Sequence, residues 1–364
     1  MKMTAVMVWS GVSLLLLSCS SGASGALDDQ PVTAVPAPQN PPPGMAAAMP
    51  QAGTGAIAPT PPAPGPMQGG AMEVDAVNPG APSQMEPEPV PPTGGPPEPS
   101  APQAGGDGVP RIPEPPADCP SFMSGSMTIG GLPTEIEAGT PGPTMGALLF
   151  SFHGTGGRGR LASVPASVRA EITSEGGIIL APTGNMGGGD RMDIAPPTGA
   201  WFLEDMEYTD LVVACAVRDH NIDPNRIYAT GCSAGGLMAG TLGLMRSEYM
   251  AAVAPNSGGI NWQGSRRLSD ASHGPAAFTM HGGTTDNVIV SFQDTSVWFH
   301  EQNRSAMNSP FMLDCNHMIG HCGAPSQLHE MAWEFMKAHP YDVGASPWAS
   351  SPPADLPDYC VVVE

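Results

Sequence analysis

Short apolar runs alternate with helical patterns through roughly the last two-thirds of this chain. The apolar runs are 147–152, 177–182, 226–230, 251–254, 276–280 and 311–314, and the helical patterns cover 164–173, 205–220, 234–245 and 327–338. A chain that alternates buried strands with helices folds into a mostly parallel, doubly wound sheet. Residues 126–136 add two apolar pieces around Gly-Gly and Pro, which predict an antiparallel hairpin at a sheet edge. The predicted fold class is α/β, a doubly wound, mostly parallel sheet with an antiparallel N-terminal hairpin.

The composition changes upstream of these elements. Residues 26–117 consist largely of Pro, Gly, Ala, Ser and Gln, with almost no aromatic side chains. Such a segment cannot bury enough apolar surface to offset its ordering entropy, and its prolines favour extended, semi-rigid conformations. We expect 19–117 to be a disordered Pro-rich stalk and 118–364 to be one folded domain. A Pro-rich ligand for a partner domain is the alternative interpretation of the stalk.

The first residues have the features of an export signal. Lys2 precedes an apolar run, 5–17, that is too short to span a bilayer comfortably. The cysteine that follows makes 1–18 resemble a bacterial lipoprotein signal, in which Cys19 becomes the lipidated first residue. A lipid there anchors the chain to the cell envelope without a transmembrane helix, and Ser20 favours the outer membrane in a Gram-negative source. Simple secretion and an uncleaved anchor are the alternatives.

The net charge and the cysteines narrow the range of partners. The formal charge of −21 does not suit a phosphate backbone, so we expect no nucleic-acid partner. We also expect the chain to be a monomer. Besides Cys19, the cysteines are Cys119, Cys215, Cys232, Cys315, Cys322 and Cys360. An even number in an exported chain favours disulfides over a metal site. Neither a CxxC pair nor an HExxH motif occurs, so we expect no metal and no cofactor.

A G-x-S-x-G motif stands where a predicted strand meets a predicted helix. Gly231-Cys232-Ser233-Ala234-Gly235 follows the run 226–230 and opens the helix 234–245. A serine on such a strand-to-helix turn is presented as a nucleophile. A tight structural turn is the alternative interpretation.

A serine hydroxyl needs a base to take its proton and a third group to orient that base. In folds of this kind the acid and then the histidine follow the serine, each after a later strand. Asp286 follows the run 276–280, and His321 follows the run 311–314. The alternatives are Asp294 as the acid, although it falls within the next helix, and His317 as the base.

Acyl transfer also needs N–H donors for the developing oxyanion. Ala234, directly after the serine, supplies one backbone N–H. The Gly-rich loop 153–157 follows an earlier strand, and Thr155 is its best candidate for the second. A flexible loop without a donor role is the alternative. We expect His153 and His281 to be structural residues that close strand ends by hydrogen bonding.

Trp201 ends a Gly-rich loop. There it could stack on a sugar or an aromatic acyl group of a substrate, and a tryptophan packed in the core is an equally good interpretation.

Several of these segments together resemble one group of esterases. They are His153-Gly154, Trp201 followed by Glu204-Asp205, the run 221–228, the hexapeptide 231–236, His281-Gly282 with Asp286, and Gly320-His321. The set is similar to the polyhydroxybutyrate depolymerase and feruloyl esterase group of α/β hydrolases, and the resemblance extends from about 126 to 339. It implies the α/β-hydrolase fold and extracellular ester hydrolysis, with Ser233, Asp286 and His321 as the catalytic triad.

The chain departs from that group directly after the histidine, where members often have a tryptophan and a proline. Here a cysteine follows His321 and another precedes Ser233, which looks like the arrangement in tannases and some fungal feruloyl esterases. This resemblance implies a disulfide between Cys232 and Cys322 that ties the two catalytic loops together. A buried thiol at Cys232 or a local bridge between Cys315 and Cys322 is the alternative. The pairing of the others is left open by the sequence; these are Cys119, Cys215, Cys315 and Cys360.

The resemblance therefore implies an exported serine ester hydrolase that acts on polymeric or plant-derived esters, such as polyhydroxyalkanoates or feruloyl and acetyl esters of polysaccharides. A serine peptidase of the same fold is one alternative, although no additional gating domain is visible in the sequence. A surface lipoprotein that binds glycans without catalysis is the other, and the intact set of Ser233, Asp286 and His321 disfavours it.

Overall fold

The computed structural model describes residues 108–184, 194, 200–341 and 343–364. The predicted signal, Cys19 and all but the end of the Pro-rich segment lie outside these residues. Among the helices of the described ranges, none combines the length and the apolar character that a membrane span requires.

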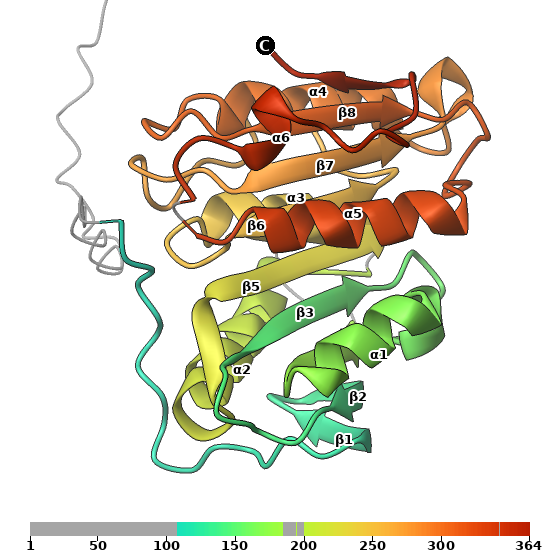
Figure 1. The fold of residues 1–364 in the computed structure, drawn as a ribbon. Coiled ribbons are helices and arrows are strands. Elements are labelled where there is room, and N and C mark those ends of the chain that lie inside the picture. Colours follow the sequence, from blue (N-terminus) through green and yellow to red (C-terminus); the bar gives the residue numbers. More distant parts are fainter. Residues whose placement is uncertain (1–107, 185–193, 195–199, 342) are drawn as a thin grey trace, which may run out of the picture. The chain divides into compact units, whose positions relative to one another are not determined.

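The described residues contain a mixed sheet with a parallel centre (Figure 1). The strands are β1 (Gly125–Ile129), β2 (Leu132–Ala138), β3 (Gly146–Phe152), β4 (Ile178–Pro182), β5 (Ile222–Cys232), β6 (Ala252–Asn256), β7 (Ala276–His281), β8 (Met312–Asn316) and β9 (Cys360–Val362), in the order β1-β2-β4-β3-β5-β6-β7-β8-β9. Six central strands are parallel to one another: β4, β3, β5, β6, β7 and β8. At one edge β2 pairs antiparallel with β4 and with β1, and at the other edge β9 pairs antiparallel with β8. The predicted doubly wound sheet and its N-terminal hairpin are confirmed.

Helices cover both faces of this sheet. They are α1 (Ala166–Ser174), α2 (Met206–Asp219), α3 (Ala234–Met245), α4 (Phe292–Asn303), α5 (Ser326–Ala338) and α6 (Pro347–Ser350). α1, α5 and α6 lie in front of the sheet in Figure 1, and α2, α3 and α4 lie behind it. The carboxyl ends of the parallel strands consequently meet at one edge, where ligands bind in folds of this kind.

Two apolar cores lie on either side of the sheet. Along β3, Leu148 and Phe150 face the core that contains α2 and α3, while Ala147 and Leu149 face the core that contains α1 and α5. A strand buried on both faces has no polar alternation, because neither face meets water. This explains why the central strands appear in the sequence as continuous apolar runs.

Two elements at the C-terminus were not predicted. α6 has four residues and β9 has three, and Val361 and Val362 are exposed. Elements this short carry too few residues for a periodic apolar pattern. β9 is held by antiparallel pairing with β8 and by the disulfide between Cys315 and Cys360.

The segment before the sheet lies along the domain. Arg111 pairs with Asp270 at 2.8 Å, and its backbone N–H donates to the carbonyl of Glu248 at 2.7 Å. Further along, the disulfide between Cys119 and Cys215 attaches the chain to α2. These contacts fix the approach to β1.

Candidate active site

The turn between β5 and α3 presents Ser233 in a strained conformation. Its φ of 60° and ψ of −124° belong to a region that residues with a side chain rarely occupy. The turn packs too closely for side chains at the flanking glycines: a Cβ on Gly235 would collide with the carbonyl oxygen of Phe152, and one on Gly231 would lie 2.5 Å from the carbonyl oxygen of Gly235. The G-x-S-x-G spacing thus follows from packing as well as from chemistry.

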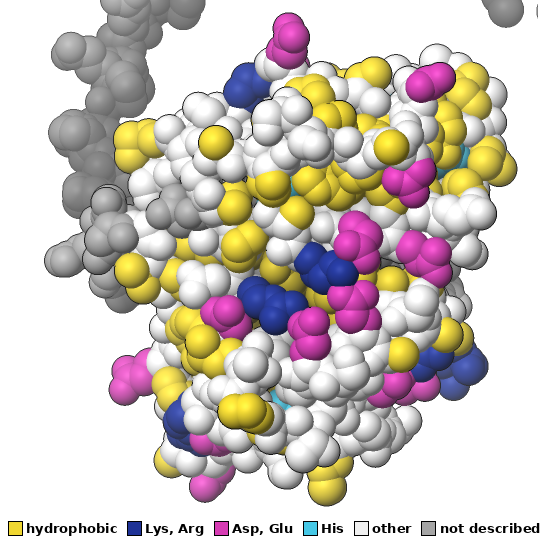
Figure 2. Space-filling model, viewed as in Figure 1, with side chains coloured by type: hydrophobic (Ala, Val, Ile, Leu, Met, Phe, Trp, Pro, Cys, Tyr) yellow, Lys and Arg dark blue, Asp and Glu magenta, His cyan; other side chains and the backbone are white. Residues whose placement is uncertain are grey.

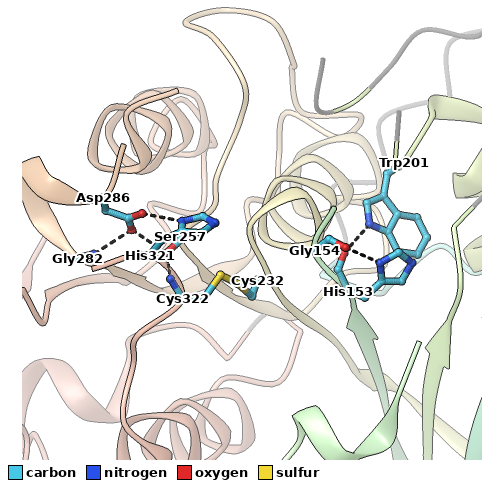
Figure 3. The surroundings of a disulfide bond; sticks show 9 residues. All are labelled: His153, Gly154, Trp201, Cys232, Ser257, Gly282, Asp286, His321 and Cys322. Atoms are coloured by element: carbon cyan, nitrogen blue, oxygen red, sulfur yellow. Dashed lines mark hydrogen bonds and ion pairs between the residues drawn. A yellow bond between two sulfur atoms is a disulfide. The ribbon is translucent and has the colours of Figure 1, made fainter. Parts of the chain in front are cut away.

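Asp286 and His321 form the pair that the sequence predicts. Asp286 follows β7 and the 3-10 turn Gly283–Thr285, and His321 lies in the loop after β8. The Nδ1 atom of His321 is 2.7 Å from Oδ1 of Asp286, and the carboxylate is fully buried (Figure 3). A proton held on Nδ1 by this bond leaves Nε2 free to accept another, which is the tautomer a general base requires.

The carboxylate of Asp286 has two further donors. Oδ2 accepts the hydroxyl of Ser257 at 2.6 Å and the backbone N–H of Gly282 at 3.0 Å. Burial acts to raise the pKa of Asp286, but the hydrogen bonds from His321, Gly282 and Ser257 outweigh it and hold the pKa below its ordinary value. The group therefore stays ionised at neutral pH.

Ser257 is a functional residue that the sequence did not reveal. It is fully buried after β6, with a φ of 44°, and its backbone N–H donates to the carbonyl of Met280 at 2.7 Å. While its hydroxyl donates to Asp286, the same oxygen accepts the N–H of Cys322 at 2.9 Å. Ser257 therefore connects the acid to the loop that carries the base. Its only sequence signal was its place shortly after the predicted strand 251–254.

A disulfide joins Cys232 to Cys322, with 5.8 Å between the Cα atoms, as the tannase-like arrangement implied. A ring nitrogen of His321 and both sulfurs lie within 4.8 Å of one another. Because the sulfurs are bonded to each other, they are not available as thiolate ligands for a metal. The bridge brings the residue before Ser233 against the residue after His321. Within the described residues no hydrogen bond yet joins the Ser233 hydroxyl to the His321 ring, and such bonds often tighten only when substrate binds.

The Gly-rich loop after β3 reaches Ser233. A Cβ on Gly154 would lie 3.2 Å from Cβ of Ser233. The carbonyl of Gly154 accepts Nδ1–H of His153 at 2.7 Å and the N–H of Gly157 at 3.0 Å. In a trans peptide the N–H of the next residue points opposite to that carbonyl, so this clamp fixes the direction of the Thr155 N–H. The loop therefore holds the Thr155 N–H in a fixed direction.

His153 itself acts as a structural residue. Its Nε2 accepts the N–H of Gly184 at 3.0 Å, which leaves the proton on Nδ1 for the Gly154 carbonyl. Burial lowers the pKa of His153, so the ring stays neutral at pH 7.

Trp201 lies in the core, where a substrate cannot stack on it. The side chain is fully buried, its Nε1–H donates to the carbonyl of His153 at 2.9 Å, and its ring contacts Phe152 and His153. Of the two interpretations of Trp201, the structure favours the packed tryptophan. Its contribution to the site is to support the loop that carries Gly154 (Figure 3).

The alternative acid and base lie elsewhere. Asp294 is in α4, where its backbone N–H is capped by Ser291. His317 is buried, and its Nδ1 accepts the N–H of Ile319, so this nitrogen does not hold a proton for a carboxylate. His281 donates from Nε2 to Asp314 at 3.1 Å and accepts the N–H of Gly283, which is a structural role at the end of β7.

Comparison with known protein families matches residues 169–318 to the prolyl oligopeptidase family. The match covers less than half of the chain; it includes Ser233 and Asp286 and ends before His321. No curated protein matches the sequence.

Solved structures match over most of the domain. Native pOPH has a TM-score of 0.51 and 16% identity, with 69% of this chain and 96% of that chain covered. A complex of a pOPH variant with pNPB gives a TM-score of 0.52 and 14% identity, covering 68% and 96% of the two chains. The chain has the α/β-hydrolase fold. A Bacillus cereus carboxylesterase is a more distant match, with a TM-score of 0.40, 19% identity, and 57% and 94% coverage. At these identities the α/β-hydrolase fold is what the structural matches show.

Proposed function

We propose that this chain is a serine carboxylic-ester hydrolase that works through an acyl-enzyme. The observation that carries the proposal is the hydrogen bond of 2.7 Å between His321 and the buried Asp286. The disulfide between Cys232 and Cys322 joins the loop of His321 to the strained turn that presents Ser233. In this proposal Ser233 is the nucleophile, His321 is the base and Asp286 is the acid that orients the base.

In the first step, the hydroxyl oxygen of Ser233 attacks the ester carbonyl while Nε2 of His321 takes its proton. Asp286 stabilises the imidazolium that forms. The tetrahedral oxyanion accepts hydrogen bonds from the backbone N–H groups of Ala234 and Thr155. His321 then returns the proton to the leaving alcohol, and water repeats the sequence to release the acid and restore Ser233.

The test is hydrolysis of short-chain p-nitrophenyl esters by the wild type and by Ser233→Ala. Because the nucleophile is lost, we expect kcat to fall by about 10⁴-fold or more. Ser174→Ala, at an exposed position on α1, is the matched control and should keep the wild-type rate. Equal rates for the wild type and Ser233→Ala would refute the proposal.

The substrates that fit this proposal are polymeric or plant-derived esters, which the resemblance to polyhydroxybutyrate depolymerases and feruloyl esterases supports. A panel of polyhydroxybutyrate, a feruloylated sugar, acetylated xylan and a gallate ester tests it. Turnover of none of them by an enzyme active on p-nitrophenyl esters would remove this substrate class.

A serine peptidase is a second candidate, because the family match is to prolyl oligopeptidases. It uses the same Ser233 chemistry on an amide. Peptide p-nitroanilides distinguish the two: faster turnover of the anilides than of matched esters would favour the peptidase. A protein that binds glycans without catalysis predicts no Ser233-dependent turnover of either.

We also propose that the chain is exported and anchored by a lipid on Cys19. The support is the sequence of 1–18 and the cysteine that follows it. Labelling cells with a fatty-acid analogue tests this: label should enter the wild type and be lost in Cys19→Ala. Equal labelling of both would exclude lipidation at this residue.

A further inference from the structure

A cavity of about 440 Å³ lies beside the candidate active site on the face of α1 and α5. Val168 of α1 and Ala332 and Met336 of α5 form part of its apolar wall. At the sheet, it is bordered by Gly154, which belongs to the Gly-rich loop 153–157, and by Cys232, the residue before Ser233.

The charged lining of this cavity is entirely cationic. Its charged residues are Arg158 and Arg160, and its lining contains neither Asp nor Glu. This is unexpected in a chain with 34 acidic residues and 13 Lys and Arg. The net charge of the lining is therefore opposite in sign to that of the whole chain.

Cations elsewhere on this face are matched by acids. Figure 2 shows the central Lys and Arg side chains directly beside Asp and Glu. Arg226 pairs with Glu175 at 2.7 Å, and Lys337 pairs with Glu334 at 2.8 Å. Such pairs satisfy each charge within the protein.

Arg158 and Arg160 differ from those cations. In the part of the chain that the structure describes, neither guanidinium belongs to an ion pair. Both side chains are exposed, and Glu135 is the acid that shares a neighbouring hollow with them. Its carboxylate accepts the backbone N–H of Leu161 at 3.1 Å. The two guanidinium groups are thus available to a ligand.

The cavity wall contains a buried indole ring and one further donor. The ring is that of Trp333, and the donor is His329. Burial lowers the pKa of His329, so this ring is neutral at pH 7 and can offer one N–H. Donors without matching acceptors favour a ligand that brings acceptors.

The cavity is close enough to the nucleophile to hold part of a substrate. Gly154 borders it, and a Cβ there would lie 3.2 Å from Cβ of Ser233. The cavity therefore borders the loop and the strand end that flank Ser233.

We propose that this arginine cavity, defined by Arg158, Arg160, His329 and Trp333, binds a carboxylate of the substrate, so that the enzyme prefers esters with a free acid group in the acyl or the alcohol part. The inference rests on the proposed ester hydrolysis. Guanidinium groups recognise carboxylates through paired N–H bonds, and the apolar wall accommodates the carbon chain that links the carboxylate to the ester.

Two matched pairs of esters test the preference and distinguish the two sources of the carboxylate. Mono(4-nitrophenyl) glutarate is compared with 4-nitrophenyl pentanoate for the acyl side, and 4-acetoxyphenylacetate with 4-acetoxyphenylacetamide for the alcohol side. In Arg158→Gln/Arg160→Gln, we expect kcat/KM for the anionic ester of one pair to fall by about tenfold relative to its neutral partner, which is about 1.4 kcal/mol. Comparing variant with wild type removes the intrinsic reactivity of each ester.

The controls separate charge from position. Arg304→Gln removes an exposed arginine at the end of α4, on the opposite face of the sheet, and should leave the ratio unchanged. Arg158→Lys/Arg160→Lys keeps the charge and should restore part of the preference. If kcat/KM in the double Gln variant changes by the same factor for the anionic and the neutral ester of both pairs, the inference is overturned.

Failure of the proposed ester hydrolysis can be distinguished from failure of the carboxylate cavity. If no ester is turned over in a Ser233-dependent way, the ester hydrolase is refuted, and calorimetry with glutarate and 4-hydroxyphenylacetate tests the cavity by itself. Binding of either acid that weakens about tenfold in the double Gln variant supports the cavity. Binding that is absent or unchanged overturns it.

Discussion

Ser257 connects the acid and the loop of the base through one hydroxyl. It donates to Asp286 at 2.6 Å and accepts the N–H of Cys322 at 2.9 Å. In Ser257→Ala, a bond to a charged group is lost, so we expect kcat to fall on the order of ten- to hundredfold with little change in KM. Steady-state kinetics on a p-nitrophenyl ester measure this. Ser309→Ala, at an exposed serine that also has a positive φ, is the matched control; a kcat for Ser257→Ala as high as that of the control would show that Ser257 does not position the acid.

Glu248 makes the stability of the fold depend on pH. Burial raises its pKa from 4.5 to about 7. Between these values the unfolded chain loses the proton while the folded chain keeps it, so the free energy of unfolding decreases as the pH rises. Thermal melts from pH 5 to pH 8 should show that Glu248→Gln weakens this decrease, whereas the exposed Glu207→Gln on α2 leaves it intact. A pH dependence that is the same in Glu248→Gln as in the wild type contradicts the assignment.

At the scale of elements, two disulfides tie β8 and its following loop to other parts of the sheet. The pair Cys232 and Cys322 joins the β5–α3 turn to the loop of the base, while the pair Cys315 and Cys360 attaches β9. Only the first borders His321. The two bridges therefore have different expected roles, one in the site and one in the fold.

Double alanine variants test this difference. In Cys232→Ala/Cys322→Ala, kcat should fall by about tenfold, because the loops that carry Ser233 and His321 are no longer held together. In Cys315→Ala/Cys360→Ala, kcat should stay within about twofold, while the unfolding free energy falls by about 2–4 kcal/mol. Kinetics and denaturant unfolding measure both effects. An equal loss of kcat in the two variants contradicts a special role for the first bridge.

Much of the fold was predictable from local patterns. The sheet centre is buried on both faces, so β3, β4 and β7 appear as continuous apolar runs, and α3 begins and ends where the pattern predicts. The order of Ser233, Asp286 and His321 also follows from strand order.

The remaining features depend on contacts between distant residues. Ser257 acts on Asp286 through space, and the burial of Trp201 depends on Phe152 and His153. Likewise, Arg158 and Trp333 border one cavity only because β3, α1 and α5 pack together. Neither periodicity nor a motif encodes such juxtapositions, so the sequence alone did not reveal them.

At the scale of the whole molecule, the candidate site lies entirely within the folded domain. Residues 108–364 include Ser233, Asp286 and His321, the Gly-rich loop 153–157 and all three disulfides of the described residues. We therefore expect a chain of 108–364 to hydrolyse p-nitrophenyl esters with a kcat/KM within about twofold of the full chain, since every residue assigned to the candidate site lies within this range. Steady-state kinetics measure this. A large loss in a truncated chain with an unchanged circular dichroism spectrum would assign a catalytic role to the N-terminal residues.

In the proposed mechanism, Ser233 is a nucleophile activated by His321 and Asp286. Reaction with a fluorophosphonate, followed by mass spectrometry of the digested protein, tests it directly, because only an activated serine is modified at an appreciable rate. We expect one adduct, on the peptide that contains Ser233, and little labelling in His321→Ala. An adduct on a different residue, or unchanged labelling of Ser233 in His321→Ala, would contradict it.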